Sequence, residues 1–182
     1  MKVLVVIDMQ NDFISGSLGT PEAVEIVPRV VEKIRSWEGP IYATQDTHQP
    51  DYLQTQEGRV LPVEHCIAGS WGWKVEQSVR EALSEGAGRN DSTLYLTKST
   101  FGSRDLAELL AQRHREQPIA RIELVGLCTD ICVISNALVL KAFLPETPLL
   151  VDAACCAGVN PQSHLNALEA MRMCQIAVVN AP

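Results

Sequence analysis

The sequence predicts an α/β fold, in which helices cover both faces of a mainly parallel sheet of six strands. The first indication is a series of short, almost continuously apolar segments, as expected for parallel strands that are buried on both faces. The second is that segments with helical periodicity separate most of these apolar runs. Alternation of this kind builds βαβ units with right-handed crossovers. We therefore expect a three-layer αβα architecture, Rossmann-like, in a single domain that spans residues 1–182.

The individual elements follow in chain order from the same patterns. Strands are predicted at residues 3–7, 41–44, 94–97, 122–125, 149–151 and 176–179. Helices are predicted at residues 22–36, 75–85, 104–112, 131–143 and 162–173. Pro161 suits the first turn of the last helix. The residues that suit helix exits are Gly86, Gly88 and Pro145.

Composition narrows the class of protein. The 182 residues are 46% hydrophobic and 20% charged, which is typical of a folded domain rather than a disordered segment. A net charge of −7 without a Lys/Arg cluster argues against nucleic acid as the partner. No apolar run approaches the roughly 20 residues that a membrane span requires, and Asp8 interrupts the N-terminal run that a signal peptide would need. The six cysteines form no CxxC pair, so we expect reduced thiols and a cytoplasmic location.

Polar side chains follow four of the predicted strands at the point where each strand ends. They are Asp8, Asp46, His48, Lys98 and the side chains of the turn at 126–132. Ligand sites of open parallel sheets lie beyond the carboxyl ends of the strands, so these groups are expected to gather at one edge. The longest non-periodic segment, residues 49–70, lies at the same end and could wall a pocket there.

The most informative stretch is residues 125–133, VGLCTDICV, in which a buried strand enters a turn and Cys132 begins a helix. A helix N-terminus carries unpaired N–H groups and a partial positive charge, which favour the nucleophilic thiolate and offer donors for an oxyanion. Thr129 and Asp130 are possible caps of this helix. The alternative is that Cys132 is a buried structural cysteine. Cys128 is a competing thiol, although its backbone N–H is expected to matter more than its sulfur.

Asp8 and Lys98 are candidates for the groups that assist a thiol. Asp8 ends an apolar strand, where partial desolvation would raise its pKa toward the range of a general base. Lys98 follows another apolar strand, where its cation would lower the pKa of a neighbouring thiol. The alternatives are a turn-capping role for Asp8 and a solvated surface position for Lys98.

Asp46 and His48 stand two residues apart, so both would point the same way from an extended backbone and could bind one metal ion. Glu57 and His65 add two possible ligands in the following loop. A set of two histidines and two carboxylates suits Zn²⁺ or another first-row divalent ion. Sulfur ligation by Cys66 is a less favoured alternative, and the Asp46/His48 pair alone is weak evidence for a metal.

Several aromatic residues fall in the loops at the same predicted edge: Phe13, Trp71, Trp73 and Phe101. Such residues commonly do no more than cover the core. The alternative is that they form a flat apolar pocket for a ring-shaped substrate.

Four segments in this order resemble the isochorismatase-like cysteine hydrolases, and among them the nicotinamidase-related branch. They are residues 6–13 (VIDMQNDF), 46–48 (DTH), 98–102 (KSTFG) and 125–133 (VGLCTDICV). The resemblance covers nearly the whole chain. It implies a catalytic triad of Asp8, Lys98 and Cys132. It also implies a cis peptide bond between Leu127 and Cys128 and an oxyanion hole formed by the backbone N–H groups of Cys128 and Cys132.

The same resemblance implies a metal held by Asp46, His48 and His65. Many members have a further histidine where this chain has Gln54, and Glu57 resembles the carboxylate that substitutes for it in others. Residues predicted to contact the substrate are Phe13, Trp73, Phe101 and Leu127. A homo-oligomer is also expected from the family alone.

Three functions are therefore considered. The first is a cysteine amidase that cleaves the C–N bond of a small carboxamide, nicotinamidase-like, through a thioester. The second keeps the triad but acts on a ureido or N-carbamoyl substrate. The third is a non-catalytic α/β interaction domain with an unreactive Cys132.

Overall fold

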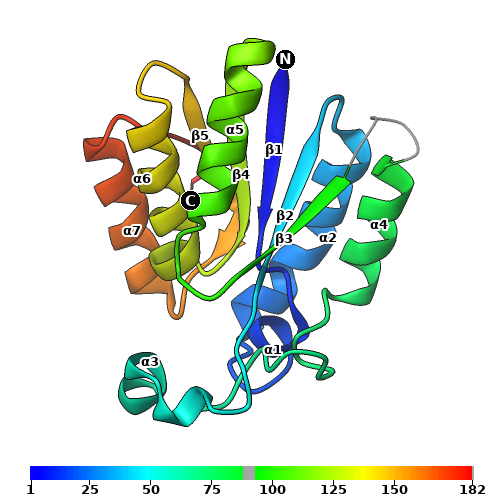
Figure 1. Ribbon diagram of the computed structural model, residues 1–182, viewed down its shortest axis with the longest axis vertical. Helices are drawn as coiled ribbons and strands as arrows, with labels where there is room; N and C mark the ends of the chain where they lie inside the picture. Colours follow the sequence, from blue (N-terminus) through cyan, green and yellow to red (C-terminus); the bar gives the residue numbers. More distant parts are fainter. Residues whose placement is uncertain (88–92, 182) are drawn as a thin grey trace.

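The computed structural model describes residues 1–87 and 93–181, which form an α/β fold around one sheet (Figure 1). The sheet has six strands in the order β3-β2-β1-β4-β5-β6, and each neighbouring pair is parallel. The strands are β1 Lys2–Ile7, β2 Ile41–Asp46, β3 Thr93–Lys98, β4 Arg121–Leu127, β5 Leu149–Ala157 and β6 Ala177–Val179. The predicted fold class and strand count are confirmed.

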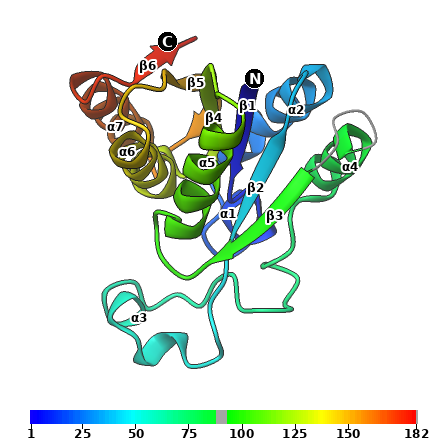
Figure 2. The same cartoon turned by 45° about the horizontal axis from the view of Figure 1, so that its top comes forward.

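Helices flank the sheet on both sides, and short helices lie at its carboxyl edge (Figures 1 and 2). The longer ones are α2 Pro21–Ser36, α4 Gln77–Ala87, α5 Arg104–Glu116, α6 Ile134–Phe143 and α7 Pro161–Met173. The short ones are α1 Asn11–Ile14, the 3₁₀-helix η1 Tyr52–Gln54, α3 Gln56–Val60 and the π-helix η2 Thr129–Val133. Among the described residues, no helix is both long enough and apolar enough to cross a bilayer.

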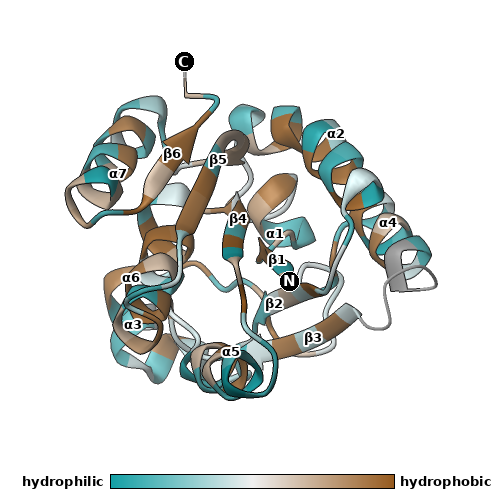
Figure 3. Ribbon diagram, turned by 90° about the horizontal axis from the view of Figure 1, so that it is seen from above, coloured by the Kyte–Doolittle hydropathy of each residue, from teal (hydrophilic) through white to brown (hydrophobic). Residues whose placement is uncertain are grey.

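Two separate cores arise because side chains alternate between the faces of a strand. On β1, Val3, Val5 and Ile7 pack with residues of α5, α6 and α7. Leu4 and Val6 of the same strand pack with residues of α2 and α4 on the other face. Figure 3 looks along the strands and shows this sandwich, with the largely hydrophobic β5 and β6 between the helical layers. The result is the expected three-layer arrangement.

Strand β5 is the element that differs most from its predicted extent of 149–151. It continues to Ala157, but its second half (DAACCA) lacks the β-branched and aromatic residues that mark strands in a sequence. Its pairing with β4 also shifts register between Leu124 and Gly126 and resumes at Cys156. The strand is therefore held by its neighbours rather than by its own propensity.

Short helices also occur where the sequence predicted only loops, because α1, η1 and α3 are too short for a helical period to be seen. Two of them lie within the segment 49–70. Pro161 does begin α7, and Pro145 follows the end of α6. Helix α4 runs through Gly86 to Ala87, so Gly86 is not its exit, and Gly88 lies outside the described residues.

A buried ionic cluster ties α2 to the centre of the sheet. Lys33 Nζ lies 2.6 Å from Glu123 Oε1 on β4 and 2.7 Å from Asp152 Oδ2 on β5, and both carboxylates are buried. Burial opposes the charge on Lys33, but the two carboxylates outweigh it and raise its pKa. Burial also opposes the charge on Asp152, but the bond from Lys33 outweighs it and lowers its pKa. Lys33 and Asp152 therefore stay charged at neutral pH.

Replacing Lys33 with methionine is expected to lower the free energy of unfolding by about 3 kcal/mol, because the buried Asp152 loses its cation and Glu123 keeps only its pair with Arg121. Arg35→Met is a matched control on the same helix. It breaks an exposed pair with Glu85 and should cost less than about 1 kcal/mol. Urea unfolding measures both values, and equal losses for the two variants would show that the cluster has no special role.

Candidate active site

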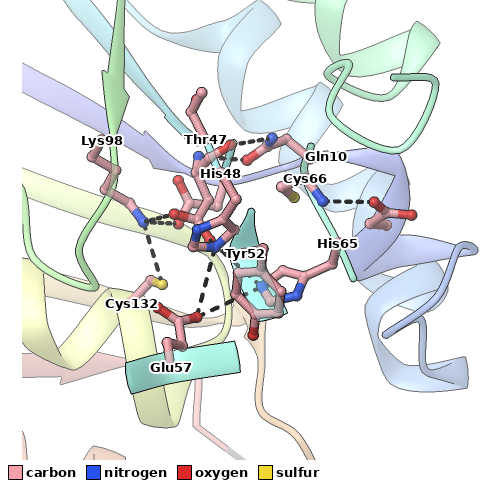
Figure 4. A network of polar contacts seen from close by, with 12 residues as sticks. Gln10, Thr47, His48, Tyr52, Glu57, His65, Cys66, Lys98 and Cys132 are labelled. Carbon is pink, nitrogen blue, oxygen red and sulfur yellow. Dashed lines mark hydrogen bonds and ion pairs between the residues drawn. The ribbon is translucent and has the colours of Figure 1, made fainter. Parts of the chain in front are cut away.

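Three side chains from separate parts of the chain meet at one sulfur atom. Lys98, the last residue of β3, places Nζ 3.5 Å from Cys132 Sγ (Figure 4). The same Nζ lies 2.7 Å from Asp8 Oδ2. Asp8 directly follows β1, and Cys132 lies in η2. The Thr44 hydroxyl donates to the second Asp8 oxygen at 2.7 Å, which orients the carboxylate. The structure thus brings together Asp8, Lys98 and Cys132, all of them buried.

The electrostatics of Cys132 differ from the sequence expectation, which was a lowered pKa at a helix N-terminus. Burial, as the largest effect, and the nearby Asp8 charge raise the pKa of Cys132 well above that of a free cysteine, and Lys98 only partly opposes them. The sequence could not indicate this because it does not reveal how deeply the sulfur is buried. The resting sulfur is therefore a thiol that must lose its proton to become a nucleophile.

Asp8 is the group placed to accept that proton. Burial raises its pKa, with Lys98 opposing, so its carboxylate is a stronger base than that of a free aspartate. Burial alone would lower the pKa of Lys98, but Asp8 and the other anionic neighbours outweigh burial and raise it. The site therefore combines a neutral thiol with a carboxylate and an ammonium group.

The turn that carries Cys132 is held in shape by its own backbone hydrogen bonds. The peptide bond between Leu127 and Cys128 is cis, as the family resemblance implied. The amides of Ile131 and Val133 both donate to the Cys128 carbonyl, at 3.1 and 3.0 Å, which closes the π-helical turn η2. Such turns are frequent at functional sites. This arrangement leaves Cys128 and Cys132 on the wall of one cavity, where their amides are the candidate oxyanion donors.

Asn136 fixes this turn, a role that no sequence pattern indicates. Its side-chain amide donates to the carbonyls of Cys132 and Phe101, at 2.8 and 3.1 Å, and its oxygen accepts from the Ser103 amide at 2.9 Å. Asn136 is fully buried. It therefore links the nucleophile turn to the loop that follows Lys98 and holds the two parts of the triad in register.

A second cluster beside the triad has the donors of a metal site. His48 Nε2 lies 3.1 Å from Asp46 Oδ2 and 3.6 Å from Glu57 Oε1. His65 Nε2 lies 3.8 and 3.7 Å from the same two oxygens. Four ligands about 2.1 Å from a tetrahedral Zn²⁺ lie about 3.4 Å from one another. The donor set Asp46, His48, Glu57 and His65 therefore fits a divalent ion of this size.

The surroundings of the cluster also suit a metal. The other ring nitrogen of His65 lies 2.8 Å from the Val63 carbonyl, which leaves Nε2 free to face the cluster. The second oxygen of Asp46 lies 3.4 Å from Lys98 Nζ, so this carboxylate joins the cluster to the triad. Gln54, where the family resemblance implied a histidine in other members, is exposed, and Glu57 lies in the cluster instead. Cys66 is buried, and its amide donates to Asp12.

Cys132 of the triad lines a cavity of about 640 Å³, together with three residues of the metal cluster. Asp46, Glu57 and His65 form a polar part of its wall beside Cys132. Three of the four residues predicted to contact the substrate line it as well: Phe13, Phe101 and Leu127. The non-periodic segment 49–70 supplies part of the wall through α3 and His65.

Trp73 is the exception among the predicted substrate contacts, because it does not line the cavity. Its indole N–H donates to Thr47 at 2.9 Å, and its carbonyl accepts from Gln10 and Gln45. The ring instead packs against the core on the α2 side of the sheet. Trp71 also lies away from the cavity, with its side chain largely exposed.

Gln10 has no role in the sequence-based predictions, but the structure gives it one. Its oxygen accepts from the Asp46 amide at 2.7 Å, and its side-chain amide donates to the Asp46 carbonyl at 2.9 Å. Its own backbone N–H donates to the Asp8 carbonyl at 2.7 Å, within a tight turn in which Asp8 has a φ of 44°. Gln10 thus connects the base to the metal cluster. Only its place two residues after Asp8 could have hinted at this.

The chain matches the Isochorismatase domain family over residues 2–181. Among solved structures, the nicotinamidase/pyrazinamidase PncA of Bacillus subtilis is 27% identical with a TM-score of 0.80, over 97% of this chain and 98% of that one. The pyrazinamidase of Pyrococcus horikoshii in complex with zinc is 25% identical with a TM-score of 0.76, over 99% of each chain. The N-carbamoylsarcosine amidase of Thermoplasma acidophilum is 26% identical with a TM-score of 0.71, over 97% of this chain and 94% of that one. Because the family covers nearly all of its length, this chain belongs to the isochorismatase family, among relatives that include nicotinamidases.

Proposed function

We propose that the protein is a cysteine amidohydrolase that releases ammonia from an uncharged carboxamide. The observation that carries the proposal is the contact of Lys98 Nζ with both Asp8 and Cys132 at the wall of a substrate-sized cavity. A buried thiol beside a basic carboxylate and a cation has no evident structural purpose. It is the arrangement that activates a sulfur nucleophile.

In the first half of the reaction, Asp8 accepts the thiol proton as the Cys132 sulfur attacks the amide carbon. The oxyanion that forms accepts hydrogen bonds from the backbone N–H groups of Cys128 and Cys132, worth about 3 kcal/mol per donor in well-studied enzymes. The carbon–nitrogen bond then breaks. Asp8 gives its proton to the leaving nitrogen, which departs as ammonia, and the acyl group stays on Cys132 as a thioester.

In the second half, a water molecule replaces ammonia beside Asp8. The carboxylate accepts a proton from this water as its oxygen attacks the thioester carbon, and the same two amides hold the oxyanion. The carbon–sulfur bond breaks, and the proton held by Asp8 returns to the sulfur. The products are a carboxylic acid and the original thiol. Lys98 remains charged throughout and stabilises the anionic states of both Asp8 and Cys132.

Asp46, His48, Glu57 and His65 are the residues that would hold a divalent ion, and two nitrogens with two carboxylates suit Zn²⁺. When bound, such an ion supplies a Lewis-acidic position for a lone pair of the substrate or a water molecule. The protein's own contribution is to fix the donors. Gln10 does so through the Asp46 backbone, and Val63 does so through the His65 ring.

The purified protein is expected to contain about one divalent ion per chain, and His48→Ala is expected to lose most of it because one of four ligands is removed. His114→Ala is a matched control, since His114 lies in the last turn of α5, at the opposite edge of the sheet. Elemental analysis measures both contents. Retention of the same metal content by His48→Ala would contradict the assignment.

A carboxamide is favoured over a ureido or N-carbamoyl acid by the charge of the cavity. Such acids carry a carboxylate, and binding sites commonly pair one with arginine or lysine. Among the described residues that line the cavity, neither arginine nor lysine occurs. A substrate carboxylate would also share the cavity with two acidic side chains, Asp46 and Glu57, whose charges a bound divalent ion would do no more than balance. An uncharged amide meets neither difficulty.

Ammonium release from nicotinamide, benzamide and an N-carbamoyl amino acid tests the proposed function. We expect kcat/KM for at least one carboxamide to exceed that for the carbamoyl compound by about tenfold or more. The reverse order would support the ureido alternative. No ammonium from any of them, together with ordinary alkylation of Cys132, would instead support the non-catalytic interaction domain.

A further inference from the structure

The cavity is larger than a single-ring amide requires. An enclosed apolar cavity of about 150 Å³ holds a benzene molecule, and this cavity measures about 640 Å³, roughly four times as much. Cys132 of the triad and Asp46, Glu57 and His65 of the metal cluster make up only part of its wall. The remaining space is therefore available to a part of the substrate that extends away from Cys132.

The outer wall of the cavity is apolar and partly exposed. Its side chains come from three separate segments: Val60 from α3, Phe101 from the β3–α5 loop and Val159 from the loop after β5. Their exposed fractions are 81%, 46% and 51%. Apolar side chains that gather around the mouth of a catalytic cavity mark a binding surface rather than a random surface pattern.

Helix α3 is held in the position that places Val60 at this mouth. It projects from the body of the protein beyond the carboxyl edge of the sheet (Figures 1 and 2). The Thr55 side chain caps it by accepting from the Gly58 amide, and a Cβ on Gly58 would clash with the Tyr52 carbonyl oxygen. Glu57, which precedes Gly58 in the same helix, is one of the four residues of the metal cluster. One short helix therefore contributes both a metal ligand and an apolar wall residue.

We propose that the natural substrate is a primary carboxamide whose acyl group is apolar and extends beyond one ring, so that its far end contacts Val60, Phe101 and Val159. This proposal rests on the amidase function proposed above. The carboxamide carbon lies at Cys132 and the acyl chain runs outward between α3 and the β3–α5 loop. The lack of arginine and lysine among the described lining residues fits an acyl group without a charge.

A series of primary amides of increasing apolar length tests the substrate class: nicotinamide, benzamide, 4-butylbenzamide and 4-hexylbenzamide. Each methylene group that leaves water is expected to raise kcat/KM by about fourfold until the far end passes the outer wall. Ammonium release measures the rates. If nicotinamide and benzamide react while kcat/KM stays flat or falls along the alkyl series, the inference is wrong but the amidase function stands.

Val60→Asp tests the outer wall directly. Because Val60 is largely exposed, the substitution should leave the fold intact, which circular dichroism can verify. We expect the ratio of kcat/KM for 4-hexylbenzamide to that for benzamide to fall by at least about tenfold. Met173→Asp is the matched control, since Met173 is equally exposed but lies at the end of α7 and outside the cavity lining. An unchanged ratio in Val60→Asp would contradict the contact.

Binding of the amides to the Cys132→Ala variant tests the outer wall of the cavity independently of the proposed chemistry. Calorimetry with the intact amides should give dissociation constants that decrease along the same series, again by about fourfold per methylene group. If affinity increases in this way while the wild-type protein hydrolyses none of the amides, the cavity assignment holds and the amidase function falls. If affinity does not change with length, the cavity assignment falls whatever the activity.

Discussion

Replacing Cys132 with alanine is expected to lower ammonia release by about 10⁴-fold or more while leaving the fold intact. The sulfur is the atom that would form the thioester, and removal of a nucleophile leaves only the binding and oxyanion contributions. Alanine is smaller and apolar, so the buried site loses a polar atom without gaining an unpaired one. Steady-state ammonium assays measure the rate, and thermal unfolding followed by circular dichroism checks the fold.

Substitutions of two other cysteines, Cys174 and Cys128, serve as controls for Cys132→Ala. Cys174→Ala alters an exposed thiol and should leave the rate unchanged. Cys128→Ala is the sharper test, because alanine keeps the backbone N–H proposed for the oxyanion and removes only the sulfur. We expect it to retain activity within about tenfold. If Cys128→Ala loses as much activity as Cys132→Ala, then either the nucleophile is assigned wrongly or the Cys128 sulfur has a chemical role of its own.

Asp8→Asn is expected to lower kcat/KM by about 10³-fold, since the amide has the shape of the carboxylate but cannot accept the thiol proton. The effect should be large because the pKa of Cys132 is raised, which leaves very little thiolate to react without a base. Asp105→Asn, on the exposed first turn of α5, is the matched control and should have no effect. Wild-type rates in Asp8→Asn would contradict the assignment of the base.

The pH dependence of the wild-type protein follows from the raised pKa of Asp8. Below that pKa the carboxyl group is protonated and cannot accept a proton, so kcat/KM should fall with decreasing pH. Because burial raises the pKa, this fall is expected at a higher pH than for a free aspartate. The residual activity of Asp8→Asn should not show this fall of kcat/KM at low pH. Metal content measured across the same pH range distinguishes protonation of Asp8 from loss of the metal.

Much of the fold could be predicted because the sheet is buried on both faces. The β1 run VLVVI has no polar interruption, and most positions of its counterparts are apolar, so their strand character is visible in the sequence. The second half of β5 was invisible because Ala and Cys carry little strand signal, and its neighbours decide its conformation. Helix α3 was invisible because five residues are fewer than two helical turns.

The site was predictable to the extent that it depends on strand ends. Asp8, Asp46 and Lys98 lie at the carboxyl ends of the adjacent strands β1, β2 and β3, so their convergence results from the parallel topology. Properties that depend on burial were not predictable. The direction of the Cys132 pKa shift and the placement of Trp73 away from the cavity both result from tertiary packing that no local pattern records.

Acid quenching during turnover, followed by mass spectrometry of the peptide that contains Cys132, tests the central claim most directly. The proposed mechanism predicts a mass increase equal to the acyl group of the amide on Cys132, strongest with a substrate whose thioester is hydrolysed slowly, and its absence from Cys132→Ala. An acyl group on another residue, or full turnover by Cys132→Ala, would contradict it.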